Sequence, residues 1–332
     1  MKNRQWLLAR RPDGAIKDGD FDFVETEAPA PGDGQVLVRN LMLSCDPTQR
    51  GWIAFDTYLP AVRIGEVVRS IGAGRIEASN HPDFKIGDIV SGLVGWQDYV
   101  VMNPKGQLNK LPPGAPLELA MSALGPTGMT AYFGLLEVGR PAPGETVVVS
   151  GAAGATGSVV GQIAKIKGCR AVGIAGGPEK CRWLVDEAGF DGAIDYKAEN
   201  VPARLRELCP KGIDIFFDNV GGDILDAALA RLAMRGRVVL CGGIATYNAT
   251  EPPPGPKNYL NLVVQRGRME GFIILDYLPR ASEAIGALAG WVQAGKIKNK
   301  VDVQRGLENA PAALRRLFEG RNEGKQLLRI AE

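Results

Sequence analysis

The sequence predicts an α/β protein that combines a mostly-β domain with a doubly wound parallel sheet. Beyond residue 146, short apolar runs alternate with helical patterns, which is typical of a parallel sheet covered by helices. Over the first 120 residues, glycine and proline recur every few positions between short strand patterns, which indicates an all-β or α+β domain. The 332 residues suffice for two domains, each with its own core. We expect the first domain at residues 1–124 and 300–332, and the second at 125–299.

The individual elements follow from hydrophobic pattern and turn residues. In the first domain we expect strands at Val36–Arg39, Gly65–Ser70, Asp88–Ser91 and Tyr99–Met102, and a last strand at Gly324–Ile330. The run Leu111-Pro112-Pro113-Gly114 marks the passage to the second domain, where a helix begins over Leu119–Leu124. After a further helix at Ser158–Lys167, we expect strands at Arg170–Ala175, Ala193–Tyr196, Ile213–Asp218 and Arg237–Cys241, with helices at Glu179–Glu187, Val201–Leu208 and Leu225–Leu232.

The run Thr146–Gly157 is the most informative part of the chain. Three valines predict a strand, and Gly151, Gly154 and Gly157 follow it before a helical pattern. Such glycines permit a tight turn, let the backbone approach phosphate and let the helix pack on the strand, while the helix N-terminus attracts the anion. The bend, with Ala153, Ala155 and Thr156, is therefore expected to bind a dinucleotide pyrophosphate. A structural glycine turn is the alternative, because the spacing is G-x-x-G-x-x-G rather than G-x-G-x-x-G.

The end of the next expected strand favours NADPH over NADH. NAD-specific folds usually carry an acidic residue about 20 residues beyond the glycines, where it binds the ribose 2′-hydroxyl. Here that position is Gly177, and Lys180 and Arg182 follow within a turn. A 2′-phosphate requires cations without a competing acid, so Lys180 is expected to bind it. The alternatives are that Lys180 is an ordinary solvated helix residue, and that Glu179 turns inward to a 2′-hydroxyl.

Composition excludes several classes of protein. The formal net charge is +2 with both signs interspersed, so nothing suggests a nucleic-acid or membrane surface. No apolar run approaches the roughly 18 residues of a membrane span, and five scattered cysteines show no paired spacing, so we expect a cytoplasmic protein with free thiols. Zinc is not expected either: His81 is the single histidine and no cysteine quartet exists, whereas zinc sites need three or four such ligands.

Short motifs along nearly the whole chain occur in a characteristic order. They are Asp46-Pro47…Arg50-Gly51, Gly95-Trp96-Gln97-Asp98-Tyr99, Gly128-Met129-Thr130-Ala131-Tyr132-Phe133-Gly134-Leu135, the bend 151–157, Phe217-Asp218-Asn219-Val220-Gly221-Gly222, Cys241-Gly242-Gly243-Ile244, Tyr247-Asn248, Arg268-Met269-Glu270-Gly271-Phe272 and Asn322-Glu323-Gly324-Lys325. In this order they resemble the zinc-independent medium-chain dehydrogenases/reductases, and most of all the alkenal double-bond reductase group. The resemblance implies a GroES-like catalytic domain and a Rossmann NADP-binding domain.

Such a fold without a metal favours reduction of an activated carbon–carbon double bond. Alcohol oxidation usually relies on a Lewis acid to stabilise an alkoxide. When hydride adds to the β-carbon of an α,β-unsaturated ketone or aldehyde, charge collects on the oxygen as an enolate, which requires only hydrogen-bond donors and a proton. We therefore expect an NADPH-dependent enone or enal reductase. The alternatives are a zinc-free quinone or carbonyl reductase and a non-catalytic, crystallin-like NADPH-binding protein.

Tyr247 is the leading catalytic candidate, because it follows a strand of the sheet and its phenol stays protonated at neutral pH. A loop tyrosine that only packs against its ligands is the alternative. The resemblance implies that Tyr247 lines the nicotinamide site and shares enolate stabilisation with the cofactor's ribose. It also places further residues at the cofactor: Asn219 near the nicotinamide ribose, Tyr196 beside Lys180 at the 2′-phosphate, backbone groups of Phe272, Ile273 and Ile274 at the carboxamide, and Cys241, Gly242 and Asn322 elsewhere along it.

Four residues are candidates for the substrate wall: Tyr58, Trp96, Tyr259 and Thr127. Aromatic side chains offer area to flat conjugated acceptors, but each of the three is as consistent with a core residue. Thr127 is equally consistent with a helix start. Thr48 and Gln49 depart from the Tyr-Met common in the group, removing an aromatic ring and adding polarity. Finally, the resemblance implies a homodimer that pairs edge strands around Arg268–Phe272.

Overall fold

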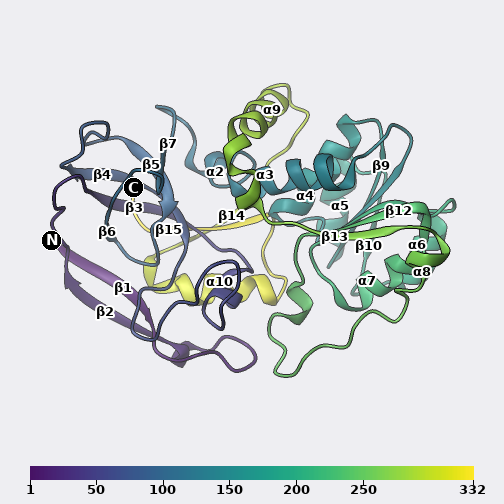
Figure 1. The fold of residues 1–332 in the computed structure, drawn as a ribbon, viewed down its shortest axis with the longest axis horizontal. Coiled ribbons are helices and arrows are strands. Elements are labelled where there is room, and N and C mark those ends of the chain that lie inside the picture. The colour runs from purple at the N-terminus through teal and green to yellow at the C-terminus, as the bar shows by residue number, and fades with distance from the viewer. The chain divides into compact units, whose positions relative to one another are not determined.

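The structure, a computed structural model, describes residues 1–332 (Figure 1). The chain forms two compact units. Unit 1 comprises Met1–Met121, Val301–Asn322 and Gln326–Glu332, and unit 2 comprises Ser122–Lys300 and Glu323–Lys325. Every helix in the chain is too short or too polar to cross a membrane.

Unit 1 is mostly β, as predicted. Its main sheet has the order β14-β15-β3-β4-β5-β7 with β6 paired to β3, and β1 and β2 form a separate antiparallel ribbon. The strands are β1 (Lys2–Leu8), β2 (Phe21–Glu27), β3 (Val36–Ser44), β4 (Ile71–Ser79), β5 (Ile89–Leu93), β6 (Tyr99–Met102), β7 (Leu108–Lys110), β14 (Val301–Arg305) and β15 (Lys325–Arg329). The helices are α1 (Gln49–Trp52), α2 (Leu117–Ala120) and α10 (Ala310–Phe318).

Two elements expected within the first 124 residues are wrong. The strand predicted at Gly65–Ser70 is absent, because Gly65 turns the chain at φ +84° and the segment forms a single bridge, between Leu7 and Val67. The helix predicted over Leu119–Leu124 is instead the short α2, which ends at Ala120. A new helix, α3 (Pro126–Phe133), begins after Gly125, whose extended backbone separates the two.

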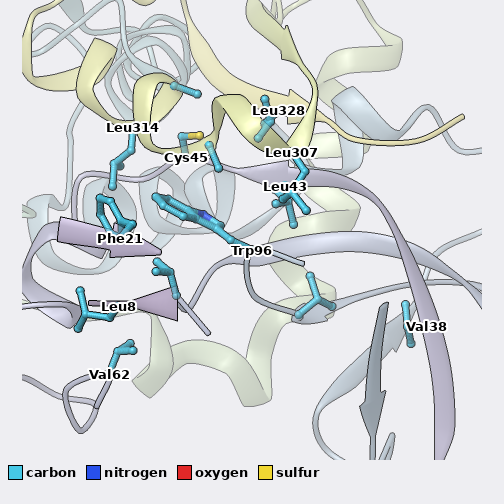
Figure 2. Close-up of a cluster of buried hydrophobic side chains, with 14 of the residues drawn as sticks. Leu8, Phe21, Val38, Leu43, Cys45, Val62, Trp96, Leu307, Leu314 and Leu328 are labelled. Atoms are coloured by element: carbon cyan, nitrogen blue, oxygen red, sulfur yellow. The ribbon is translucent and has the colours of Figure 1, made fainter. Parts of the chain in front are cut away.

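The core of unit 1 lies between the main sheet, the β1–β2 ribbon and α10 (Figure 2). Strand β3 is buried along almost its whole length because both its faces carry apolar side chains. Leu43, Phe21 and Leu314 converge from strand, ribbon and helix around Trp96, which is 0% exposed.

Unit 2 is a doubly wound parallel sheet, also as predicted. Its strand order is β10-β9-β8-β11-β12-β13, and all pairings are parallel. Helices α4 and α5 lie on one side of the sheet and α6 and α7 on the other (Figure 1). The strands are β8 (Thr146–Ser150), β9 (Arg170–Ala175), β10 (Gly192–Asp195), β11 (Ile213–Asp218), β12 (Leu232–Leu240) and β13 (Arg268–Gly271). The helices are α4 (Ala155–Ile166), α5 (Pro178–Asp186), α6 (Val201–Leu208), α7 (Gly222–Leu229), α8 (Asn261–Val264) and α9 (Ala281–Gln293), with a π-helix at Gly134–Gly139.

The strand order reverses between β8 and β11. From β8 the chain winds outward through β9 and β10, and from β11 it winds the other way through β12 and β13. In open parallel sheets, ligands bind at the carboxyl ends of the two strands that flank such a reversal. Here those strands end at Ser150 and Asp218, which fixes where a site is expected in this unit.

Candidate cofactor site at the carboxyl edge of the parallel sheet

The bend after β8 can be made only of very small residues. Gly151 has φ +57°, a conformation that L side chains rarely adopt. A Cβ atom on Gly157 would lie 2.4 Å from the carbonyl oxygen of Gly151, and one on Gly154 would lie 3.1 Å from the same oxygen. The amide of Ala152 is anchored to the carbonyl of Ile174 on the neighbouring strand at 3.0 Å. The helix that follows is thus held close against the end of its own strand.

The N-terminus of α4 is suited to a phosphate group. The helix begins at Ala155 after Gly154, and no side chain caps it. The amides of the first helical turn have no partner inside a helix, and the helix dipole places positive potential at this end. Because the glycines of the bend carry no side chains, a pyrophosphate can approach the backbone amides of Ala155, Thr156 and Gly157 and accept hydrogen bonds from them. These residues therefore fit a dinucleotide.

The two strand ends at the reversal are joined by side-chain hydrogen bonds. The Ser150 hydroxyl donates to Oδ1 of Asp218 at 2.7 Å and accepts the backbone amide of Asn219 at 2.8 Å. The Asn219 side-chain amide donates to the Ser150 carbonyl at 2.7 Å. A Cβ on Gly151 would lie 3.5 Å from the Cβ of Asn219, so this asparagine lies directly beside the glycine bend.

Asp218 is a buried carboxylate that organises the turn following β11. Besides the Ser150 hydroxyl, it accepts the backbone amides of Val220 and Gly221 at 3.0 Å each. Burial raises the pKa of Asp218, and the hydrogen bonds from Gly221, Ser150 and Val220 oppose that rise. Its backbone carbonyl accepts the amides of Cys241 and Gly242 at 2.9 and 3.1 Å.

Tyr247 folds back over the glycines that follow β12. Its hydroxyl oxygen accepts the amide of Gly243 at 3.1 Å, and a Cβ on Gly242 would lie 3.2 Å from that oxygen. The same Cβ would lie 3.5 Å from the carbonyl of Asn219. The structure therefore brings Gly151, Asn219, Gly242 and Tyr247 into one group. The neighbouring Cys241 thiol has its pKa raised to about 12 by burial and by the charge of Asp218.

A second group forms where β9 and β10 end. The ring of Tyr196 lies over Gly176, where a Cβ would meet it at 2.8 Å. The amide of Gly177, which has φ +101°, donates to Oδ1 of Asp195 at 2.8 Å, and the amide of Lys197 donates to the same oxygen at 3.0 Å. The Asp195 carboxylate at the end of β10 is therefore engaged by the turn. Lys180 is half-buried in the first turn of α5, and Glu179 is exposed.

The segment after β13 is fixed by aromatic packing. Phe272 lies against Gly134, where a Cβ would come within 2.3 Å of its ring, and contacts Phe217 edge to face. Ile273 is extended and precedes a 3-10 helix that begins at Ile274. The backbone at Ile273 and Ile274 is thereby held at the end of the last strand.

Among the predicted substrate residues, Thr127 and Tyr259 belong to unit 2. The Thr127 hydroxyl donates to the carbonyl of Ser122 at 3.1 Å, which stabilises the start of α3. Tyr259 is 54% exposed, and its neighbour Asn258 is bound to Asp226 of α7 through both its backbone and its side chain. This attachment ties Tyr259 to α7 rather than to the loop that carries Tyr247.

The remaining candidates belong to unit 1. Trp96 is a correction: it fills the core, so it has no surface to offer a substrate without opening that core (Figure 2). Tyr58 is 46% exposed, and its hydroxyl shares a hydrogen bond with that of Thr48 at 2.9 Å. Gln49 adds no polarity to a surface, because it is fully buried between the amide of Asp46 and the carbonyl of Arg69. Asn322 is half-buried at the end of its segment.

No three His, Cys, Asp or Glu side chains are grouped as metal ligands. His81 instead packs edge to face on Phe84, and its Nδ1 accepts the amide of Asp83. Sequence reasoning missed Ser150 and Asp218 as parts of the site. Their positions at two strand ends of a parallel sheet were the available signal.

The comparisons with known proteins agree with this architecture. Residues 4–111 match the N-terminal domain of oxidoreductase, and residues 155–289 match the zinc-binding dehydrogenase family. NADPH-dependent curcumin reductase from Escherichia coli is 44% identical, the match covering 99% of this chain and 97% of the relative. A 2-alkenal reductase (NADP(+)-dependent) from Nicotiana tabacum is 39% identical over 100% of this chain and 98% of the relative. CurA from Vibrio vulnificus, solved in complex with NADPH, matches with a TM-score of 0.94 and 41% identity over 99% of each chain.

A mostly-β unit combined with a doubly wound sheet, with a glycine bend at the strand reversal, defines a dinucleotide-dependent oxidoreductase of the medium-chain dehydrogenase/reductase superfamily. Within that superfamily, the chain belongs to the alkenal double-bond reductase group, together with the curcumin, 2-alkenal and prostaglandin reductases that it matches along its whole length. The family resemblance stated from the motifs is confirmed.

Proposed function

We propose that this protein reduces the carbon–carbon double bond of α,β-unsaturated ketones and aldehydes with NADPH. The observation that carries the proposal is the group at the strand reversal: a glycine bend suited to pyrophosphate, Asn219 beside it, and the Tyr247 hydroxyl over Gly242. The names of the relatives, which include curcumin, 2-alkenal and (+)-pulegone reductases, support the same chemistry.

In this proposal the cofactor's pyrophosphate binds the amides between Gly151 and Gly157, and Asn219 lies by the nicotinamide ribose. Lys180 and Tyr196 bind the 2′-phosphate, beside a turn in which the Asp195 carboxylate already accepts backbone amides. The backbone at Ile273 and Ile274 serves the carboxamide. Further cofactor contacts are proposed for Cys241 and Asn322. The bound dinucleotide supplies hydride to the β-carbon of the acceptor.

Tyr247 then stabilises the charge that develops on the acceptor's oxygen. Its hydroxyl oxygen accepts the Gly243 amide, and a hydroxyl that accepts one hydrogen bond donates the next one more strongly. A donor held in place before the reaction costs no reorganisation when the enolate forms, which is why such groups lower the barrier. Tyr58 is proposed as an aromatic surface for the conjugated part of the substrate.

The test is NADPH oxidation with a panel of enones, enals, quinones and simple ketones, with product masses determined. The proposal predicts turnover of enones and enals to products two mass units heavier that retain their carbonyl group. Exclusive formation of alcohols, or turnover of quinones alone, would contradict it, and tight NADPH binding without any turnover would indicate a non-catalytic protein.

We further propose a cytoplasmic homodimer. Strand β13 is the edge of the unit 2 sheet, and exposed apolar side chains lie on it and on the preceding helix, among them Met269, Val263 and Val264. Pairing β13 with its copy would satisfy the open strand edge and cover these side chains. Light scattering after gel filtration should give twice the mass of one chain, and Glu270→Pro in β13 should give monomers. A monomeric wild-type protein would contradict this assembly.

A further inference from the structure

Two buried side chains, those of Ser150 and Asp218, hold three predicted parts of the site in place: the glycine bend, Asn219 and the loop of Tyr247. Ser150 ends β8 immediately before the glycine bend, and Asp218 ends β11 immediately before Asn219. Both are 0% exposed, and their side chains are joined by the 2.7 Å hydrogen bond from the Ser150 hydroxyl. The pair therefore joins the ends of β8 and β11 at the strand reversal, next to the residues proposed to contact the cofactor.

The hydroxyl and the backbone carbonyl of Ser150 each accept one hydrogen bond from Asn219. The hydroxyl accepts the Asn219 backbone amide at 2.8 Å, and the Ser150 carbonyl accepts the Asn219 side-chain amide at 2.7 Å. Asn219 is thus attached to the end of β8 by its backbone and by its side chain. Removing the hydroxyl would leave one amide and one carboxylate oxygen without that partner inside the sheet, a costly loss for buried groups.

The Asp218 carboxylate acts on Tyr247 through the turn that it holds. It accepts the amides of Val220 and Gly221, which sets the carbonyls of this turn. Those carbonyls bind the tyrosine loop: the Asn219 carbonyl accepts the amide of Ile244 at 3.3 Å and the Val220 carbonyl accepts the amide of Ala245 at 3.1 Å.

The tyrosine loop then closes on itself. The Tyr247 amide donates to the Ile244 carbonyl at 3.4 Å, and the Tyr247 hydroxyl returns to the Gly243 amide at 3.1 Å. A displacement of the 219–221 turn would therefore move the phenol that the proposed reaction needs. A carboxylate suits this position because it accepts in several directions and donates in none.

We infer that Asp218 and Ser150 are positioning residues, which hold Asn219 for cofactor binding and Tyr247 for enolate stabilisation. The part of the inference that concerns Tyr247, its catalytic half, rests on the proposed function. The part that concerns Asn219, its cofactor half, is about NADPH binding alone. Neither side chain is required to touch cofactor or substrate. The effect of Asp218 on turnover should pass through the Tyr247 hydroxyl, whereas the effect of both residues on NADPH affinity should pass through Asn219.

The chain offers a matched control on the same strand. Asp214, at the start of β11, accepts the backbone amide of Thr146 at 2.8 Å. It lies at the amino end of β11, whereas the site lies at the carboxyl end of the same strand, so Asp214→Asn makes the same chemical change away from the site. Asp218→Asn keeps the shape of the side chain but turns one acceptor oxygen into a donor facing the Gly221 amide, now 3.1 Å away.

The experiment measures NADPH affinity by nucleotide fluorescence, enone kcat and melting temperature for Asp218→Asn, Ser150→Ala and Asp214→Asn, each with Tyr247 and with Tyr247→Phe. With Tyr247 present, Asp218→Asn should lower kcat by about 10- to 100-fold, as expected when a reacting group is displaced. In the Phe background this loss should shrink to about twofold or less, because the group being positioned is gone. Ser150→Ala and Asp218→Asn should weaken NADPH binding by about tenfold in both backgrounds, as expected for a broken buried hydrogen bond.

Three results would overturn the inference. The first is a loss of kcat for Asp218→Asn that is as large in the Tyr247→Phe protein as in the protein with Tyr247. The second is an equal loss of kcat and NADPH affinity for Asp214→Asn and Asp218→Asn, and the third is an unchanged NADPH affinity for both Ser150→Ala and Asp218→Asn. If the wild-type protein binds NADPH but reduces no enone, the proposed function fails while the binding measurements still decide the cofactor half. If Asp218→Asn does not fold, Ser150→Ala carries the same binding and double-variant test, because it removes the hydroxyl that holds the Asp218 carboxylate and should lower kcat in the same Tyr247-dependent way.

Discussion

Gly157→Ala tests directly whether the bend after β8 is built for close backbone approach. The added Cβ would lie 2.4 Å from the Gly151 carbonyl oxygen and 2.9 Å from the Cα of Ala152. Ordinary contacts between such atoms begin at about 3.5 Å, so helix α4 and the bend must separate by roughly 1 Å. Overpacking of this kind costs about 1–3 kcal/mol.

Two measurements follow from that displacement. The melting temperature should fall by about 2–12 °C, because 1 kcal/mol corresponds to roughly 2–4 °C in a domain of 150–250 residues. The dissociation constant for NADPH should rise by about tenfold or more, because the amides at the start of α4 no longer converge on the pyrophosphate.

Gly286→Ala in α9 is the matched control. A Cβ there has no neighbour within 4 Å, so the change should stabilise the protein by about 0.5–1 kcal/mol and leave NADPH binding unaltered. If Gly157→Ala instead keeps both the wild-type melting temperature and the wild-type NADPH affinity, the assignment of the bend to the pyrophosphate is refuted.

Three further outcomes are expected. Lys180→Ala should weaken NADPH binding by about 10- to 150-fold, the equivalent of roughly 1.5–3 kcal/mol for a hydrogen bond to a charged group, with NADH unaffected; equal losses with both cofactors in fluorescence titrations would remove Lys180 from the 2′-phosphate. Tyr247→Phe should lower kcat by about 10- to 100-fold with little change in KM, and an unchanged kcat would exclude it from the reaction. Burial raises the pKa of Cys169, Cys181 and Cys209 to about 11 and that of Cys241 to about 12. Because the thiolate is the nucleophile, enones should alkylate these thiols slowly at pH 7.5 and about tenfold faster per pH unit above it, whereas rapid labelling of Cys241 at pH 7.5 in peptide mass spectra would contradict its raised pKa.

The centre of the parallel sheet was predictable because strands β8, β9 and β11 are buried on both faces. Such strands form continuous apolar runs that single-sequence patterns detect, and the strands Ile213–Asp218 and Arg170–Ala175 have the predicted bounds. The order of strands around the reversal was not predicted from these runs. It depends on pairings between residues distant along the chain, such as Phe217 with Val149.

The first domain was less predictable for a related reason. Strand β1, with the sequence KNRQWLL, and strand β2, with FDFVETE, carry many polar side chains and are paired with each other along their whole length. Their identity as strands is therefore decided by tertiary structure rather than by local preference. The burial of Trp96 could not be predicted either, because the sequence around an aromatic residue does not show whether that residue lines a site or fills a core.

The residues of the candidate site were also predictable only in part. Asn219 and Tyr247 were singled out because each follows a strand of the sheet and stands in a family motif, and their cofactor and catalytic roles stay predictions. Ser150 and Asp218 were not singled out, because their significance lies in a hydrogen bond between residues 68 positions apart. Such long-range polar contacts leave no periodic signature in a sequence.

The most direct test of the central claim is the fate of deuterium carried at both C4 positions of the nicotinamide in NADPH. During reduction of a simple enone, nuclear magnetic resonance of the product should find the label on the β-carbon of a saturated ketone. Label on a carbinol carbon, or a product without label, would contradict hydride transfer to an activated double bond.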